Sequence, residues 1–277
     1  MIHLKYSLLL FLILVSSCIR TPDEEVYFLS EIYYSELRDL LVDLDESVRD
    51  EYWINFIDVG DREDYGDGYI RYAENLEMKF ILDTAGVLIN NGRAVKERFD
   101  EQRTCIVYSS THDTVAYLAA QILQFLGYTK IYFYEGGITD WLAHGDYLNM
   151  TYHGFKSWHS GSFPFEDTLV ALVDIHPDPW YRGLEVLEGH IPGAINIPAD
   201  SLIKMENGTF SLVDEGKFLT ENIPDRSARI VVYDSEGASD KSAGFLEAAG
   251  FLEYERVYLF QSGYNEWIAN GNPVVTE

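Results

Sequence analysis

The sequence has little cysteine and little positive charge. Of its 277 residues, two are cysteines, Cys18 and Cys105, and 20 are lysine or arginine against 46 aspartate or glutamate. Two thiols can form neither a disulfide framework nor a four-thiolate zinc site. The formal net charge of −26 repels phosphate backbones, so we expect no nucleic-acid partner. The 14% aromatic content argues against intrinsic disorder, because it supplies core-forming side chains.

One apolar run, Leu8–Val15, is too short to cross a bilayer as a permanent helix. It ends in Val15-Ser16-Ser17-Cys18, where small residues directly precede a cysteine. This pattern resembles the lipobox of bacterial lipoproteins. The alternative is an ordinary secretory signal with a chance cysteine.

The lipoprotein resemblance implies that residues 1–17 are a signal peptide and residues 18–25 a lipidated tether. Cys18 would be acylated and would bind the lipid bilayer. Residue 19 is Ile19, not the aspartate that often marks inner-membrane retention. We therefore expect an exported cell-envelope lipoprotein, at the outer membrane facing the periplasm rather than at the inner membrane.

The rest of the chain is a long repeat. The spacing Gly137–Trp141–Gly145 recurs as Gly263–Trp267–Gly271. Each half opens with an apolar strand that ends in an aspartate, Asp58 or Asp174. Short apolar strands that alternate with helical stretches indicate parallel α/β units. The sequence therefore predicts two tandem α/β domains, each a mostly parallel sheet with helices on both faces.

The segment Gly189-His190-Ile191-Pro192-Gly193-Ala194-Ile195-Asn196-Ile197-Pro198 resembles the signature motif of rhodanese domains. The chain as a whole resembles the tandem rhodaneses, the arrangement of thiosulfate and 3-mercaptopyruvate sulfurtransferases. The resemblance implies a degenerate rhodanese-like domain at 26–147, a linker at 148–167 and a rhodanese-like domain at 168–277. The residues expected to have structural roles are Asp58, Asp174, Gly189, His190, Pro192 and Gly193.

Sulfur transfer in this family needs a thiolate directly after the central strand, in a loop that leads into a helix N-terminus. Here that position holds Ser109 in the first half and Asp234 in the second. A serine hydroxyl or a carboxylate cannot hold a persulfide. The candidate active-site loops are Ser109, Ser110, Thr111, His112, Asp113 and Thr114, and Asp234, Ser235, Glu236, Gly237, Ala238 and Ser239.

The positive charge that an anionic sulfur donor requires is also missing. The family often places arginine two residues after the opening aspartate, where this chain has Gly60 and His176. Glu188 precedes the motif at another position that is often arginine. The second loop offers one cation, Lys241, among carboxylates.

Other candidate sites have simpler interpretations. Cys105 begins a predicted buried strand, at the wrong end of the sheet for catalysis. Ser109, His112 and Asp113 lie too close in sequence for a Ser-His-Asp triad. We expect the serine, threonine and aspartate residues of this loop, like Asp234, to cap the helix that follows. The histidines His153, His159, His176 and His190 lack metal-ligand spacing. We expect no metal site and no cofactor.

The favoured hypothesis is a membrane-anchored, catalytically inactive tandem rhodanese-like lipoprotein, a pseudoenzyme. It would act as a binding or scaffolding module for an envelope protein or a small ligand that the sequence does not identify. The alternative is a sulfurtransferase that moves sulfane sulfur from thiosulfate or 3-mercaptopyruvate to a thiophilic acceptor.

Overall fold

The computed structural model describes residues 29–46, 54–109, 114–160, 170–183, 189–206 and 209–276. The predicted signal peptide, the tether and Cys18 lie outside these residues. The chain divides into two compact units. The first unit holds Met1–Arg62 and Tyr72–Gly137, and the second holds Glu63–Arg71 and Ile138–Glu277. No helix in the described part of the chain is both long and apolar enough to cross a membrane.

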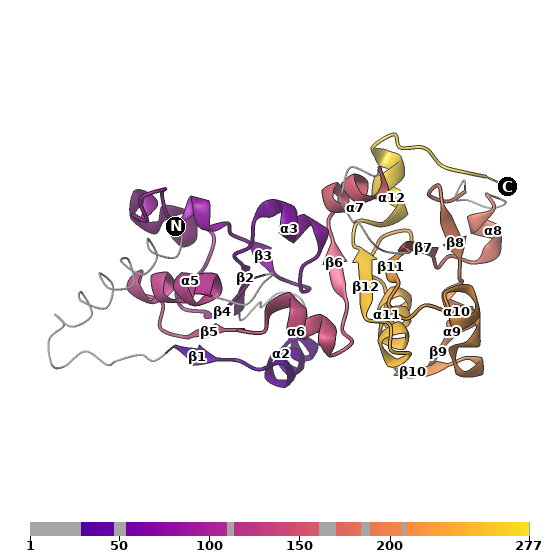
Figure 1. Cartoon of the computed structure of the whole chain (residues 1–277), viewed down its shortest axis with the longest axis horizontal. Helices are drawn as coiled ribbons and strands as arrows, with labels where there is room; N and C mark the ends of the chain where they lie inside the picture. The colour runs from indigo at the N-terminus through magenta and orange to yellow at the C-terminus, as the bar shows by residue number, and fades with distance from the viewer. Residues whose placement is uncertain are drawn as a thin grey trace, which may run out of the picture. The chain divides into compact units, whose positions relative to one another are not determined.

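The first unit is built on a five-stranded parallel sheet in the order β1-β5-β4-β2-β3 (Figure 1). Its elements are β1 (Ser30–Glu31), α2 (Tyr34–Glu46), β2 (Ile54–Asp58), β3 (Glu74–Asn75), the 3-10 helices η1 (Met78–Phe80) and η2 (Ile89–Gly92), α4 (Arg93–Lys96), β4 (Thr104–Tyr108), α5 (Thr114–Phe125) and β5 (Ile131–Phe133). The two helices α3 (Arg62–Asp67) and α6 (Gly137–Ala143) each begin with the last residue of a first-unit segment and continue in the second unit.

The second unit repeats this topology with a five-stranded parallel sheet in the order β6-β12-β11-β7-β8. Its further elements are β6 (Leu148–Met150), α7 (Tyr152–His159), β7 (Val170–Asp174), α8 (Asp178–Tyr181), β8 (Ala194–Asn196), α9 (Ala199–Leu202), the antiparallel pair β9 (Ile203–Glu206) and β10 (Thr209–Leu212), the 3-10 helix η3 (Asp214–Gly216), α10 (Lys217–Asn222), β11 (Arg229–Tyr233), α11 (Asp240–Phe251), β12 (Arg256–Phe260) and α12 (Gly263–Ala269). The two sheets confirm the predicted tandem α/β fold.

The linker predicted at 148–167 is wrong for its first part. Residues Leu148–Met150 form β6, which pairs in parallel with β12 as the edge strand of the second sheet. Helix α7 follows directly, and the Thr151 side chain caps it by accepting a hydrogen bond from the Gly154 N–H. A three-residue strand carries too little periodic pattern to be read from sequence, because alternation needs at least four residues to stand out.

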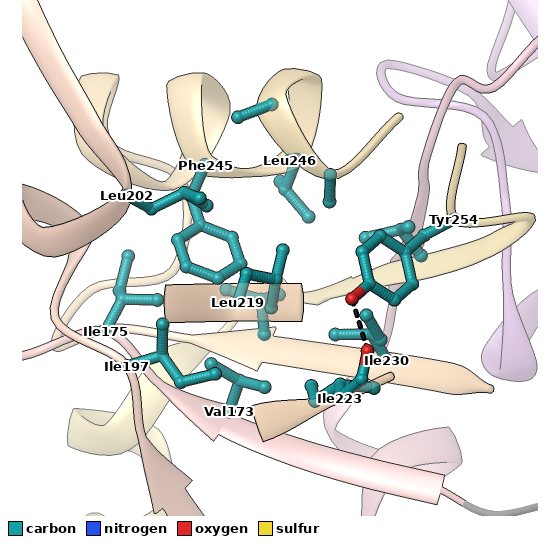
Figure 2. Packing of buried hydrophobic residues seen from close by; sticks show 14 of the residues in the cluster. Val173, Ile175, Ile197, Leu202, Leu219, Ile223, Ile230, Phe245, Leu246 and Tyr254 are labelled. Carbon is teal, nitrogen blue, oxygen red and sulfur yellow. Dashed lines mark hydrogen bonds between the residues drawn. The ribbon is translucent and has the colours of Figure 1, made fainter. Parts of the chain in front are cut away.

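The core of the second unit lies between one face of its sheet and helices α9, α10 and α11. Figure 2 shows Phe245 of α11 packed in one cluster with Leu219 of α10 and Val173 of β7. Phe245 and Leu219 are completely buried. Burying one side chain of this size stabilises the fold by about 1.5–3 kcal/mol. The buried Tyr254 hydroxyl donates a hydrogen bond to the carbonyl oxygen of Ile223 (Figure 2).

Aromatic packing covers the opposite face of the second sheet. The Phe155 ring of α7 stacks on Phe260 of β12 with centroids 4.1 Å apart, and it meets the edge of Trp267 at 5.5 Å. The Trp267 indole N–H donates to the Pro273 carbonyl at 2.8 Å. Helices therefore cover both faces of this sheet, as the fold class predicts.

Candidate functional site

The candidate site of the second unit forms where two neighbouring parallel strands end. Strands β7 and β11 are hydrogen-bonded partners, and their last residues, Asp174 and Tyr233, lie opposite one another in the register. The residues that follow these strands, His176 and the loop from Asp234 to Ser239, are therefore brought to the same edge of the sheet. In open parallel sheets this carboxyl edge is where ligands bind.

The Asp234 carboxylate accepts hydrogen bonds from groups of its own loop. Its Oδ1 accepts from the Glu236 N–H at 3.1 Å, and its Oδ2 accepts from the Ser239 hydroxyl at 2.5 Å. The Gly237 N–H is a further backbone donor to this carboxyl group. Burial raises the pKa of Asp234 above its ordinary value, and these donors, together with His176, oppose the rise. The loop is thus organised around an internal carboxyl group.

The predicted capping role of Asp234 is wrong. The N-cap of α11 is Ser239, whose hydroxyl accepts from the Ser242 N–H at 3.1 Å, while the Ser242 hydroxyl accepts from the Ser239 N–H at 2.7 Å. This reciprocal capping box satisfies donors at the helix start. Asp234 lies five residues earlier and folds back onto the loop itself.

Close backbone contacts hold this loop against the first turn of α12 and the residues just before it. The Asp234 and Ser235 carbonyls accept from the N–H groups of Tyr264 and Asn265 at 2.8 and 2.9 Å. Gly237 has a φ of +83°, and a Cβ placed there would lie 1.6 Å from the Gln261 carbonyl oxygen. Only glycine fits this position, because both the dihedral angle and the space exclude a side chain.

A chain of three polar side chains joins the two strand ends. His176 Nδ1 lies 2.7 Å from Asp174 Oδ1, and His176 Nε2 lies 2.7 Å from the Ser235 hydroxyl oxygen. The same Asp174 oxygen accepts from the His176 backbone N–H at 2.9 Å. Asp174 is completely buried, His176 is buried and Ser235 is half-buried.

Sequence patterns did not predict these three linked side chains. In the sequence, His176 occupies a position that is often arginine in the family, and Ser235 is one of several polar loop residues. The two residues are separated by 59 positions, and only the adjacency of β7 and β11 brings them together. The available signal was an aspartate and a histidine two residues apart at the end of one strand, with a serine after the neighbouring strand.

The rhodanese-like domain family matches residues 39–144 and 164–270 of this chain. The chain belongs to the rhodanese-like domain family. The match occurs twice, in agreement with the two sheets, so the protein is a tandem rhodanese-like protein.

Two curated relatives are each 31% identical to this rhodanese-like protein over 105 residues. Both bear the name "Putative thiosulfate sulfurtransferase SseB" and come from Mycobacterium tuberculosis strains CDC 1551 / Oshkosh and ATCC 25618 / H37Rv. Each alignment covers 35% of this chain and 35% of the relative, so the match spans about a third of either protein.

Solved structures show more distant similarity. The crystal structure of thiosulfate sulfurtransferase from Pseudomonas aeruginosa aligns at 16% identity, over 90% of this chain and 44% of that one, with a TM-score of 0.33. The crystal structure of YnjE aligns at 17% identity, over 89% of this chain and 68% of that one, with a TM-score of 0.37.

The first rhodanese-like domain has the same strand-end framework without the histidine. Asp58 is buried, and its Oδ1 accepts from the Gly60 N–H at 2.7 Å. Asn75 donates to the Gly60 carbonyl at 2.8 Å, as Asn196 donates to the His176 carbonyl at 2.9 Å. In both domains the opening aspartate accepts a hydrogen bond from the backbone N–H two residues later. Gly60 has no side chain with which to extend the framework toward the loop.

Most of the first candidate loop lies outside the described residues. Ser109, which follows β4, is buried, and Thr114 begins α5. Residues 110–113 (Ser110, Thr111, His112 and Asp113) are not among the residues that the structure describes. The assignment of Ser109 and Asp234 to the family's nucleophile position stays a prediction.

The rhodanese motif of the second domain forms a structural turn. Gly189 has a φ of +95°, and a Cβ there would lie 2.0 Å from the Val275 carbonyl oxygen. The His190 ring stacks on Tyr181 with centroids 3.8 Å apart, and its Nδ1 lies 3.0 Å from the Tyr181 carbonyl oxygen. The Pro192 carbonyl lies 2.9 Å from His159 Nε2. Gly193 has a φ of +82°. The motif therefore fixes the path of the backbone at this turn.

Cys105 is a core residue of the first domain. It is completely buried in β4, where its sulfur accepts from the Asn55 side-chain amide at 3.3 Å. Burial raises the pKa of the Cys105 thiol to about 11, so this thiol stays protonated at neutral pH. Within the described ranges, no group of three or more histidine, cysteine or acidic residues could hold a metal ion. Lys241 pairs with Asp200 at 3.1 Å.

Proposed function

We propose that this tandem rhodanese-like protein does not transfer sulfur and serves as a binding or scaffolding module anchored in the cell envelope. The observation that carries the proposal is the hydrogen bonding of Asp234. The family's chemistry needs the loop's backbone N–H groups to stabilise a negative sulfur atom. Here the Glu236 N–H and the Ser239 hydroxyl already donate to the Asp234 carboxyl group.

Charge supports the same proposal. An anionic donor such as thiosulfate would approach the Asp234 carboxylate, and two like charges roughly 4 Å apart repel by about 1–4 kcal/mol, depending on solvent exposure. The nearby cation Lys241 pairs with Asp200 instead. Neither a nucleophilic thiolate nor a cationic clamp supports sulfur transfer at this loop.

The test is a sulfurtransferase assay on the purified protein, with thiosulfate or 3-mercaptopyruvate as donor and cyanide as acceptor. We expect no turnover above the rate without protein. Turnover that persists in the Cys105→Ser variant would establish the alternative, a sulfurtransferase that uses another nucleophile.

Asp234→Cys sharpens this test, because it places a thiol at the predicted nucleophile position and removes the carboxylate. We expect an alkylating reagent to label this thiol much faster than Cys105, because the loop donors stabilise a thiolate. A thiol that stays inert would show that Asp234 does not occupy the nucleophile position.

We also propose that Cys18 is acylated and holds the two domains at the outer membrane. The support is the Val15-Ser16-Ser17-Cys18 pattern. The net charge of −26 would hold the folded part away from anionic headgroups. Metabolic labelling with a fatty acid should mark the wild-type protein and not Cys18→Ser. Equal labelling of both proteins, or of neither, would contradict the anchor and leave the assignment of the loop unaffected.

A further inference from the structure

We propose that Ser235 is an acyl-accepting nucleophile, activated by His176 as general base and oriented by Asp174, for activated esters and thioesters. This inference goes beyond the proposed binding role and does not depend on it. It rests on the chain of hydrogen bonds that joins the ends of β7 and β11 in the second unit.

The direction of the hydrogen bonds gives His176 the form that a base requires. A carboxylate only accepts hydrogen bonds, so the contact of 2.7 Å with Asp174 places the imidazole proton on Nδ1. When the ring is neutral, Nε2 is an acceptor, and the Ser235 hydroxyl oxygen lies 2.7 Å away, in position to donate to it. Nucleophile, base and orienting carboxylate are thus in the order and within the distances that nucleophilic serine catalysis uses.

The surroundings hold the histidine in place. The ring centroid of His176 lies 5.6 Å from that of Trp180 and 6.3 Å from that of Tyr264. The Asn196 side chain donates to the backbone carbonyls of Asp174 and His176 at 3.1 and 2.9 Å. A base whose orientation is fixed by packing and hydrogen bonds is prepared for proton transfer, because little reorganisation is needed.

Ser235 is the part of this arrangement that a substrate can reach. It is half-buried, and the next residue, Glu236, is exposed. Asp174 has a structural counterpart in Asp58, whose Oδ1 accepts a hydrogen bond from the N–H of Gly60, a residue with no side chain. The contacts from His176 to Ser235 are therefore not needed to build this corner of the fold, which leaves them available for chemistry.

The proposed reaction balances without any further reagent. The Ser235 oxygen forms a bond to the acyl carbon as the bond to the leaving group breaks, and the hydroxyl proton passes to His176 Nε2. The departing alcohol or thiol receives that proton. Water then attacks the acyl-serine, gives one proton to His176, and releases the acid as the serine oxygen regains its proton.

Asp234 limits the substrate class. The donors that could stabilise the negative oxygen of a tetrahedral intermediate, such as the Glu236 N–H, already bind the Asp234 carboxyl group. Loss of one such donor costs about 100- to 1,000-fold in rate. Amides and alkyl esters therefore react too slowly, whereas aryl esters and thioesters, which have good leaving groups, remain within reach.

The experiment is acylation of the full chain by p-nitrophenyl acetate, with release of p-nitrophenolate followed by absorbance and the modified residue identified by peptide mass spectrometry. We expect an acetyl group on Ser235 and none there in Ser235→Ala. Ser211→Ala removes an exposed serine of the same unit and should leave the reaction unchanged.

Two histidine variants separate chemistry from folding. His176→Gln keeps a polar side chain but cannot act as a base, so acylation of Ser235 should fall about 100-fold or more while thermal unfolding shows a folded protein. In His176→Gly, added imidazole should restore acylation, which a purely structural role of the ring would not allow. Absence of acetyl-Ser235 in the wild-type protein, or acylation of His176→Gln at the wild-type rate, would overturn the proposal.

Discussion

The two rhodanese-like domains share a strand-end framework and differ in what they attach to it. In each, a buried aspartate accepts a hydrogen bond from the N–H two residues later, and an asparagine from the neighbouring strand binds the carbonyl of that same residue. That residue is Gly60 in the first domain and His176 in the second. One fold therefore accommodates either glycine or histidine at this position, and in the second domain the histidine carries the hydrogen bonding on to the loop. Chemistry thus depends on the residues of the site and not on the fold alone.

The largest expected difference between the two domains is in the core that packs against α11. Phe245 is the sixth residue of α11, and the sixth residue of α5 is Ala119; both are buried. We expect Phe245→Ala to lower the free energy of unfolding by about 3–5 kcal/mol. Denaturant unfolding, with hydrogen exchange of α11 peptides, measures it.

Phe251 on the same helix is the matched control, because its side chain is 74% exposed. Its replacement by alanine should change stability by less than about 0.5 kcal/mol. Equal effects at the two positions would show that Phe245 is not a core residue.

Replacing the histidine by the first domain's residue tests the difference between the two corners. His176→Gly removes the contacts with the Asp174 side chain and with Ser235, and it leaves a buried cavity beside Trp180. We expect a loss of about 2–3 kcal/mol in the stability of the second domain, measured by thermal unfolding. An unchanged stability would mean that the packing and hydrogen bonds of the His176 ring add no net stability to the second domain.

The thiol of the first domain should be structural and unreactive. Cys105→Ser keeps the hydrogen bond with Asn55 but buries a hydroxyl, so we expect a loss of about 1–2 kcal/mol. Because the pKa of the thiol is raised to about 11, a thiol reagent should not modify Cys105 at neutral pH in the folded protein. Rapid modification of native Cys105, in a Cys18→Ser background, would refute its burial.

The smallest effect concerns Asp67, which groups with the second unit. Burial, with Asp64 and Glu63 nearby, raises the pKa of Asp67 from 3.8 to about 7, and Arg229 opposes the rise. Between these two values the folded protein keeps a proton that the unfolded chain has lost, so this group lowers stability as pH rises from about 4 to 7.

Asp67→Asn should therefore stabilise the protein at pH 7 and above, by about 1 kcal/mol after allowance for the half-exposed side chain, and leave it unchanged near pH 4. Thermal unfolding across this range measures the difference. The exposed Asp64 provides a control, since Asp64→Asn should change stability less. A stabilisation by Asp67→Asn that is as large at pH 4 as at pH 7 would rule out titration of Asp67 as its cause.

Local patterns predicted the fold, and long-range contacts defined the site. The glycine and tryptophan spacing indicated a repeat. The two indole N–H groups make equivalent hydrogen bonds, because Trp141 donates to the Tyr147 carbonyl and Trp267 donates to the Pro273 carbonyl, each six residues later. Strand β6 was missed because three residues carry almost no periodic signal.

The site was harder to predict because its contacts depend on register. The path of one loop decides two of these contacts. The Asp234 carboxylate accepts from the Glu236 N–H, and Ser239 caps α11 in its place. The bond between His176 and Ser235 exists only because β7 and β11 are neighbours in the sheet. Identifying these residues required the folded chain.

The central claim is that the second loop presents a carboxyl group where a sulfurtransferase presents sulfur. The most direct test incubates the purified protein with thiosulfate, removes the excess donor, and measures the intact mass and the peptides. We expect no added sulfur atom on any residue of the wild-type chain. A persulfide on the wild-type protein would contradict it.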